Sequence, residues 1–584
     1  MLEQGLLVQN RESLRIVSLD KLIPIALSGF CFLLAWWLMG CFNLNFPIGY
    51  SGDAFFMSWL TKRLMDGFWY FNSVYSGFPF GSVFYDFPAS DSGNFFVLKL
   101  LGIFTHSYIL TINIYFLLGF SVTSLSSYFI LQKLGINKAF SLVGAILFTF
   151  LPFHFLRIAH LFYTWYFSIP IFVWFAFKIS SEIPIFFESG KIGWKKIKPY
   201  LILLALASFG VYYSLFAVLM FIASGIVGTL KWKTSKNIVS ALIVIFMVTL
   251  GISINIAPNA IYVYKNGINP TVAHRSALES EYYGLKLTQM LLPQQAHRFR
   301  FFRDISNHYS QTFPLVTENS TASLGLVGSI GLIILLGVAI GTPFFRFQID
   351  SRIQLLSFLA IFLFLFSTIG GFASIFSLLI TPMIRAWNRV SVFIGFASIF
   401  TFILCAEKLF TKFISIKFLK LSEICTVIFL IIFGIWDQTG SFTPAYLNTL
   451  KNQFLSDRHF VQKIEQLISE GAVYQLPYIA FPEEVINNNF FSYDLFRGYL
   501  HSSTLHWNSG GMKGRSGDLF FRKLAEQPLS QQIKTIKTLA FNGIYIDRRG
   551  YLDHGLAIEK ELAIITGNKV DLVSEDGNLA FFLI

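Results

Sequence analysis

Long apolar runs separated by short basic clusters constrain this chain more than any other feature. Hydrophobic residues make up 54% of its 584 residues and charged residues only 13%, far more apolar than the soluble average. About 20 apolar residues cross a bilayer as a helix, so we predict an α-helical polytopic membrane protein with about eleven transmembrane helices. The predicted spans are residues 22–41, 109–131, 139–153, 161–177, 200–210, 212–230, 238–257, 324–345, 355–369, 390–406 and 422–436.

Basic residues predict the orientation of these spans. The formal net charge is +13, and most of the positive charge lies in the short turns between apolar runs, as in Lys231, Lys233 and Lys236. The positive-inside rule accounts for this pattern, so we expect no binding of nucleic acid. Residues 1–21 are then cytoplasmic, and an odd number of spans leaves the C-terminal residues on the extracytoplasmic side.

The spans divide the chain into three parts. A transmembrane domain, 22–436, follows the N-terminal segment and carries two large external loops, 43–108 and 258–323. Residues 372–381 are apolar but too few to cross, which predicts a re-entrant or interfacial helix. Residues 437–584 alternate helical and strand-like patterns, such as AVYQLPY and GIYID, and predict an extracytoplasmic α/β domain.

The first external loop holds the acidic residues with the strongest claim to chemistry. Asp53 follows the first span in GYSGDAFF, where an ionised group near the membrane is costly and usually functional; the alternative is a helix start. Asp86 and Asp91 flank Pro88 in FYDFPASDSGN and suit Mg²⁺ or Mn²⁺ together with a substrate phosphate, or else belong to ordinary turns. If a divalent metal binds, Asp53, Asp86 and Asp91 are its candidate ligands.

Three polar side chains follow the third span at intervals of three residues. His154, Arg157 and His160 in PFHFLRIAH would share one helix face, where the arginine binds a lipid phosphate and a histidine moves a proton. The alternative is an interfacial anchor. Arg385 and Arg389, four residues apart in IRAWNRVS, have a similar claim to a phosphate. In the second loop Glu318 is a possible acid or ligand, although solvation alone also explains such residues.

The arrangement resembles the GT-C glycosyltransferases, which use polyprenyl-phosphate-linked sugars. The resemblance lies in a first span followed at once by a long acidic loop, many further spans, a second large loop and a C-terminal external domain. Within that superfamily, the run GDAFFMSWLTKRLMDGFWYFN followed by GFPFG and YDFP resembles uncharacterised bacterial multispan proteins of the YfhO-like kind. No Asp-x-Asp or tandem acidic pair follows the first span, in contrast to the family pattern.

The resemblance implies roles for individual residues. Asp53 matches the acid of the first loop that acts as a base or ligand, Asp86 or Asp91 its later acidic partner, and Glu318 the acid late in the second loop. The expected activity is sugar transfer from a polyprenyl-phosphate donor to a cell-envelope glycan or lipid, on the extracytoplasmic side of a bacterial inner membrane. The alternatives are a translocase or transporter of sugar or lipid-linked sugar, and a non-catalytic envelope assembly factor.

Overall fold

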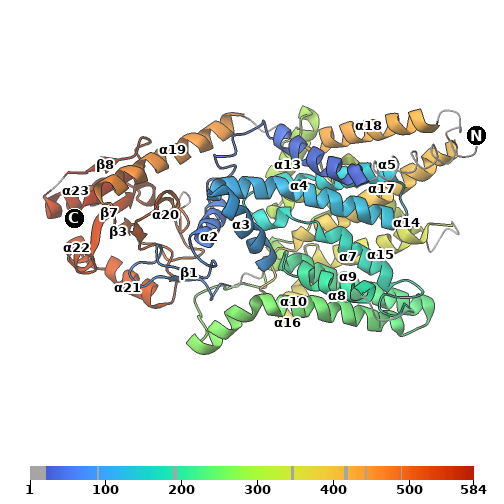
Figure 1. Ribbon diagram of the computed structural model, residues 1–584, viewed down its shortest axis with the longest axis horizontal. Helices are drawn as coiled ribbons and strands as arrows, with labels where there is room; N and C mark the ends of the chain where they lie inside the picture. The colour runs from blue at the N-terminus through green and yellow to red at the C-terminus, as the bar shows by residue number, and fades with distance from the viewer. Residues whose placement is uncertain are drawn as a thin grey trace, which may run out of the picture.

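A bundle of long helices and a smaller α/β domain make up the two halves of the molecule (Figure 1). The computed structural model describes residues 21–584 except 88–90, 189–193, 343–347, 414–418, 441–443, 488–489 and 568. Helix α19 (Pro444–Leu467) leads from the bundle into the α/β domain. The predicted cytoplasmic segment 1–21 lies, up to residue 20, outside the described residues.

Among the described residues, seven helical segments are long and apolar enough to cross a membrane. They are Lys21–Leu38, α4 (Tyr108–Lys133), Lys138–Phe155 formed by α5 (Lys138–Thr149) and α6 (Pro152–Phe155), α9 (Val211–Trp232), α10 (Lys236–Asn266), Trp387–Lys412 formed by η3 (Trp387–Val390) and α17 (Ser391–Phe413), and Leu421–Gln438 in α18 (Leu419–Gln438).

Shorter helices complete the bundle. Four apolar ones are α3 (Ser92–Thr105), α7 (Ser168–Ile179), α14 (Gly325–Gly341) and α15 (Ser351–Ser367), and α8 (Trp194–Leu206) is also short. The predicted eleven spans include α7, α8, α14 and α15, so that number stays a prediction. The predicted re-entrant piece is α16 (Phe372–Leu379), whose eight residues are too few to cross a bilayer.

The first external loop is folded. It forms α2 (Asp53–Asp66), the short antiparallel pair β1 (Asn72–Ser73) and β2 (Ser82–Val83), and then α3. The buried Arg63 of α2 ties this loop together, because its guanidinium donates to the carbonyl oxygens of Tyr70, Phe71 and Ser82 and to the Ser82 hydroxyl. The first loop therefore consists of two helices and a hairpin.

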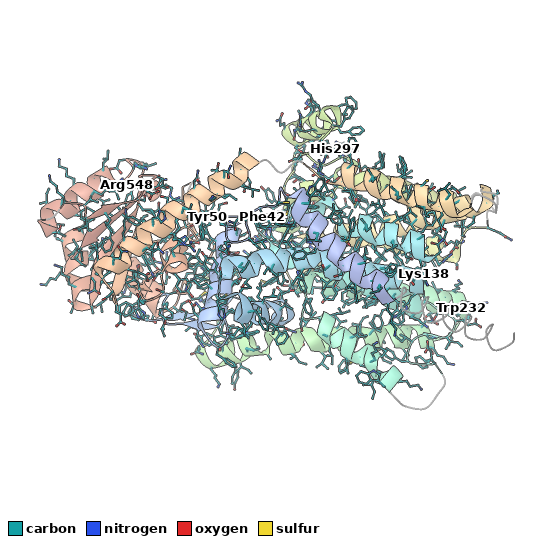
Figure 2. All side chains as sticks on the ribbon, turned by 45° about the horizontal axis from the view of Figure 1, so that its top comes forward. Phe42, Tyr50, Lys138, Trp232, His297 and Arg548 are labelled. Atoms are coloured by element: carbon teal, nitrogen blue, oxygen red, sulfur yellow. The ribbon has the colours of Figure 1, made fainter. Side chains whose placement is uncertain are left out.

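The second external region is shorter than predicted because α10 continues past Pro258 to Asn266. It contains α11 (Glu279–Tyr282), α12 (Leu287–Leu291), α13 (Arg300–Thr312) and η2 (Glu318–Ala322). Helix α13 projects from the side of the bundle, next to the labelled His297 in Figure 2.

The C-terminal domain is built on a five-stranded sheet in the order β6-β3-β7-β9-β8. Strand β3 (Ala472–Leu476) pairs in parallel with β6 (His506–Trp507) and β7 (Phe541–Asp547), and β9 (Leu579–Leu583) runs antiparallel to β7 and β8 (Leu572–Val573). The remaining elements are the hairpin β4 (Val485–Asn487) and β5 (Phe490–Phe491), with α20 (Phe496–His501), α21 (Ser516–Ala525), α22 (Leu529–Thr538), η5 (Arg548–Gly550) and α23 (Leu556–Thr566).

The first external loop docks against the open edge of this sheet. Ser76 pairs in parallel with Trp507 of β6: the Trp507 N–H donates to the Tyr75 carbonyl at 2.9 Å, and the Phe78 N–H donates to the Trp507 carbonyl at 3.0 Å. Backbone hydrogen bonds of this kind add a strand to a sheet. The glycine- and serine-rich segment 497–518 of the C-terminal domain is therefore a surface that contacts the first loop.

Candidate functional site

Asp53 is the first residue of α2, at the end of the bundle that faces the C-terminal domain. The helix begins there because Gly52 adopts φ 49° and ψ −127°, a conformation that residues with a side chain rarely reach. A carboxylate in the first turn interacts favourably with the helix dipole. The Asp53 side chain is 47% exposed, so an approaching molecule can reach it. Asp53 is therefore both the first residue of a helix and an exposed acid, so the two alternatives predicted from the sequence hold together.

His160 connects Asp53 to Glu318. Its Nε2 atom lies 3.3 Å from Asp53 Oδ2 and 3.6 Å from Glu318 Oε1. Burial lowers the pKa of His160 to about 3, and the nearby Arg389 acts in the same direction. The imidazole is therefore neutral near pH 7, and its Nε2 atom lies between two carboxylates.

Glu318, at the start of η2, is held by arginine from two other segments. Arg157 Nη1 donates to Glu318 Oε2 at 2.5 Å, and Arg389 Nη2 lies 3.4 Å from the same oxygen. Burial opposes ionisation of Glu318, but Arg389 and Arg157 outweigh it and hold the pKa of this carboxyl well below its usual range. Glu318 is consequently ionised at every physiological pH.

Arg157 is a clamp for Glu318 rather than a free phosphate ligand. Its side chain is 1% exposed, and its Nη2 also donates to the Thr321 hydroxyl at 2.9 Å and to Asn388 Oδ1 at 2.8 Å. Both terminal nitrogens of this guanidinium are already bonded within the protein, and the side chain is too buried for a lipid phosphate to reach. We therefore correct the expected phosphate-binding role of Arg157 to a positioning role.

Arg389 and Arg385 differ in their access to ligand. Arg389 is 8% exposed and its guanidinium lies between the rings of Tyr163 and Tyr212, 4.1 and 4.6 Å from their centroids. Arg385 is 32% exposed, pairs with Glu279 at 2.6 Å and is the more accessible of the two. Both cations stabilise the ionised form of Asp53, so both lie within electrostatic reach of it.

The pKa of Asp53 is shifted in the opposite direction to the pKa of Glu318. Partial burial raises the pKa of Asp53, and the neighbouring negative charge of Glu318 adds to the rise. Two carboxyl groups bridged by one histidine therefore have different affinities for a proton. Such a difference separates a fixed anion, Glu318, from a group able to take up a proton, Asp53.

The C-terminal domain contributes residues that sequence analysis did not find. Glu483 and Tyr493 both interact electrostatically with Asp53. Glu483 also pairs with Arg275 of the second external region, at 2.5 Å. Asp53 and Glu483 are 430 residues apart, and no local pattern marks Glu483, Tyr163 or Tyr212, so only the fold brings them together.

Asp86 and Asp91 have direct partners other than Asp53, although Asp91 lies within electrostatic reach of Arg389. Asp86, with a side chain only 2% exposed, forms a two-pronged ion pair with Arg515 at 2.6 and 2.8 Å, and so joins the first loop to the C-terminal domain. We therefore correct its expected place beside Asp53. Asp91 precedes α3 and faces the backbone N–H groups of Gly210 and Val211; burial raises its pKa to about 6.

His154 does not share a face with Arg157 and His160. Helix α6 ends at Phe155 and the chain turns, so the expected helical spacing of three is lost. The His154 ring is buried and stacks on Phe120 with ring centroids 3.5 Å apart. The physical reason is the short length of α6, whose four residues end before Arg157 is reached.

The residues expected as metal ligands have other partners in this structure, and metal binding stays a prediction. Among the described residues, no group of three or more histidine, cysteine, aspartate or glutamate side chains is placed to hold a metal ion. Asp86 is committed to Arg515, and Asp91 to the start of α9.

Comparison with known proteins finds only remote structural similarity. No family model matches the chain, and no curated protein matches it. Among solved structures it is similar to an oligosaccharyltransferase of Archaeoglobus fulgidus, crystallised with zinc and sulfate, with 10% sequence identity and a TM-score of 0.43. The similarity covers 89% of this chain and 68% of that one. The expected YfhO-like kinship stays a prediction.

Proposed function

We propose that this chain is a membrane glycosyltransferase that moves a sugar from a polyprenyl-phosphate donor to a hydroxyl of a cell-envelope glycan or lipid. The observation that carries the proposal is the exposed carboxyl of Asp53, whose pKa is raised, with the partly exposed cation Arg385 within electrostatic reach of it. A hydroxyl acceptor needs a base, and a phosphate leaving group needs cations, within one site.

In the proposed reaction, Asp53 accepts the proton of the acceptor hydroxyl as that oxygen attacks the anomeric carbon of the sugar. The bond between this carbon and the phosphate oxygen breaks, and its electron pair leaves on the polyprenyl phosphate. Arg385, exposed beside Glu279, supplies positive charge to the departing phosphate. His160 and Glu318, fixed by Arg157 and Arg389, hold the Asp53 carboxylate in place.

The position of the site supports an extracytoplasmic reaction. Lys138 and Trp232 lie at one end of the bundle, and Tyr50, three residues before Asp53, lies at the other end with the C-terminal domain beyond it (Figure 2). The lysine-rich turns, with Lys133 and Lys231, belong to the end opposite Asp53. Because positive turns stay in the cytoplasm, we place Asp53 and the C-terminal domain outside, in a bacterial inner membrane.

The experiment is release of polyprenyl phosphate by the full-length chain in liposomes. The donors are undecaprenyl-phosphate-linked hexoses and aminosugars, tested one at a time with a total cell-envelope extract as acceptor, and mass spectrometry measures the freed lipid phosphate. We expect release by the wild type and a loss of about a hundredfold or more in Asp53→Asn, because a positioned base contributes about 10²–10⁴.

The matched control is Asp304→Asn, which makes the same change at a 59% exposed carboxylate on α13 and should leave release unchanged. Equal release by Asp53→Asn and wild type would refute the role of Asp53 as the base. Absence of release with every donor, from a wild type shown to be folded by its thermal transition, would refute the glycosyltransferase proposal.

A further inference from the structure

A second cavity lies at the other end of α2, between the membrane bundle and the C-terminal domain. Its volume is about 410 Å³, and it is lined by the last turn of α2, the start of α4, one face of α19 and the end of α20. We propose that this cavity is a binding site for a neutral saccharide segment, separate from the site at Asp53. A cavity of this volume accommodates a small ligand.

The cavity is distinct from the site around Asp53. Thirteen residues of α2 separate Asp53 from Asp66, which lines the cavity, and a helix rises 1.5 Å per residue, so the two lie about 20 Å apart. None of the residues that contact Glu318 lines the cavity. A ligand here would therefore bind without touching the base or the arginines of the proposed reaction.

The charges of the lining favour a neutral ligand. Lys62 pairs with Asp66 at 2.7 Å, and α19 adds one cation, Arg458, and one carboxylate, Glu465, to the lining. Burial lowers the pKa of His501 to about 3, so this wall carries no charge near pH 7. An anion would meet two carboxylates, and a cation would meet Lys62 and Arg458. A hydroxyl-rich ligand meets donors and acceptors in equal measure.

Several polar atoms of the lining have hydrogen-bonding capacity left. Lys62 and the Tyr499 hydroxyl both donate to Oδ2 of Asp66, an exposed residue whose Oδ1 can accept a further hydrogen bond from a ligand. The Tyr108 hydroxyl is buried and has no hydrogen-bond partner in the described part of the chain. Buried polar atoms without partners are uncommon and need an explanation. Sugar hydroxyls, each a donor and an acceptor, are suitable partners for both.

The wall of the cavity is held rigid from behind. The Tyr50 hydroxyl lies 2.6 Å from His501 Nε2 and donates to Asp457 Oδ2 at 2.7 Å, and Arg497 donates to the same Asp457 oxygen at 2.7 Å. These side chains come from the first loop, α19 and α20. A hydrogen-bonded network of this kind fixes the lining before a ligand arrives, which lowers the cost of ordering it on binding.

The experiment measures binding of free trisaccharides to the full-length chain by saturation-transfer-difference NMR. The protein is kept in lauryldimethylamine oxide, because maltoside and glucoside detergents would compete for the cavity. The probes are maltotriose, cellotriose, mannotriose and chitotriose, with glycerophosphoethanolamine and inorganic phosphate as charged comparisons. We expect at least one trisaccharide to bind in the millimolar range and the charged probes not to bind.

Two variants and two controls locate the binding. Gln462→Trp fills the cavity from α19 and Asp66→Asn removes its carboxylate, and each should weaken binding about tenfold or more. Lys463→Trp places the same ring on an exposed neighbouring position, and Asp53→Asn disables only the proposed base; both should bind as the wild type does. Thermal transitions monitored by tryptophan fluorescence show that each variant is folded.

Three results would overturn the inference: no trisaccharide bound by folded wild type, binding unchanged in both Gln462→Trp and Asp66→Asn, or binding of a charged probe in place of a sugar. Loss of transfer in Asp53→Asn with saccharide binding retained would support both sites independently. Saccharide binding by a chain that releases no polyprenyl phosphate would refute the proposed reaction and leave the cavity assignment intact.

Discussion

Glu318→Gln removes the negative charge that neutralises two buried arginines. Glu318 Oε2 lies 2.5 Å from Arg157 Nη1 and 3.4 Å from Arg389 Nη2, and the Arg157 side chain, 1% exposed, cannot regain water. Removing one partner of a buried ion pair costs about 3–5 kcal/mol because the other charge stays buried without compensation. Glu318 itself is 25% exposed, so we expect the lower end of this range, about 3 kcal/mol.

The double variant Arg157→Met with Glu318→Gln measures the interaction energy between these two residues. It removes both charges of the Arg157–Glu318 pair, so the penalty for an unpaired Arg157 disappears. Arg389 still lacks Glu318, and the hydrogen bonds of Arg157 to Thr321 and Asn388 are still lost. We expect the double variant to be more stable than the sum of the two single variants by about 2 kcal/mol, within the usual range for directly contacting residues.

The assay is thermal unfolding of the purified full-length chain, followed by tryptophan fluorescence. Large domains shift by about 2 °C or less per kcal/mol, so Glu318→Gln should lower the midpoint by about 4–6 °C. Glu188→Gln is the control, since the Lys178–Glu188 pair has nearly the same geometry at 2.9 Å but is largely exposed. Exposed pairs contribute about 0–1 kcal/mol, so its shift should be at most about 2 °C.

The pH dependence gives the same reasoning a second test. The pKa of Glu318 is lower in the folded protein than in the unfolded one, so its contribution is present above the unfolded value and declines only as the pH falls through the folded value. The difference between wild type and Glu318→Gln should therefore be constant between pH 6 and 8. Two results together would refute the proposed role of the Arg157–Glu318 pair. They are a thermal unfolding midpoint of Glu318→Gln equal to that of the wild type, and a destabilisation of the double variant equal to the sum of the two single variants.

Two further predictions concern the base and the domain contact. The transfer rate of the wild type should fall as the pH drops through the raised pKa of Asp53, because the base must be ionised. His160→Gln should keep this acidic limb, since the pKa of His160 is already about 3. Initial rates from pH 5 to 9 measure both. Arg515→Leu leaves the buried Asp86 without its ion-pair partner and should destabilise the contact between the first loop and the C-terminal domain by about 3 kcal/mol. Limited proteolysis near residues 86–91 should then be faster. Unchanged cleavage would contradict the prediction.

The membrane helices were predictable from hydropathy. A helix that crosses a bilayer needs an apolar run of a minimum length, and such runs are visible in the sequence. Helices α4, α9 and α17 lie where such runs were found, and α16 is as short as the ten-residue run predicted. Boundaries were less accurate where a polar residue continues a helix: α10 runs on through Pro258 to Asn266 because nothing after the apolar run stops it.

The site was only partly predictable for a physical reason. Asp53, Arg157, His160, Glu318 and Arg389 were each noted from local sequence, and the fold places them together. Their roles depend on burial and on partners from distant segments. Arg157 becomes a clamp because Glu318, 161 residues later, occupies it, and Asp86 becomes a domain contact because Arg515 lies opposite. Spacing along the chain carries no information about either partner.

The C-terminal domain is coupled to the base through the first loop. Its edge strand β6 pairs with Ser76, and Trp59 of α2 stacks on Phe496 of α20 with ring centroids 4.7 Å apart. Trp59 lies under two turns of helix from Asp53, so α2 is held between the membrane bundle and the sheet. A movement of the C-terminal domain must either break these contacts or carry α2 with it. The surface that joins the two halves therefore also holds the helix that carries Asp53, and Glu483, paired with Arg275, lies within electrostatic reach of this carboxyl.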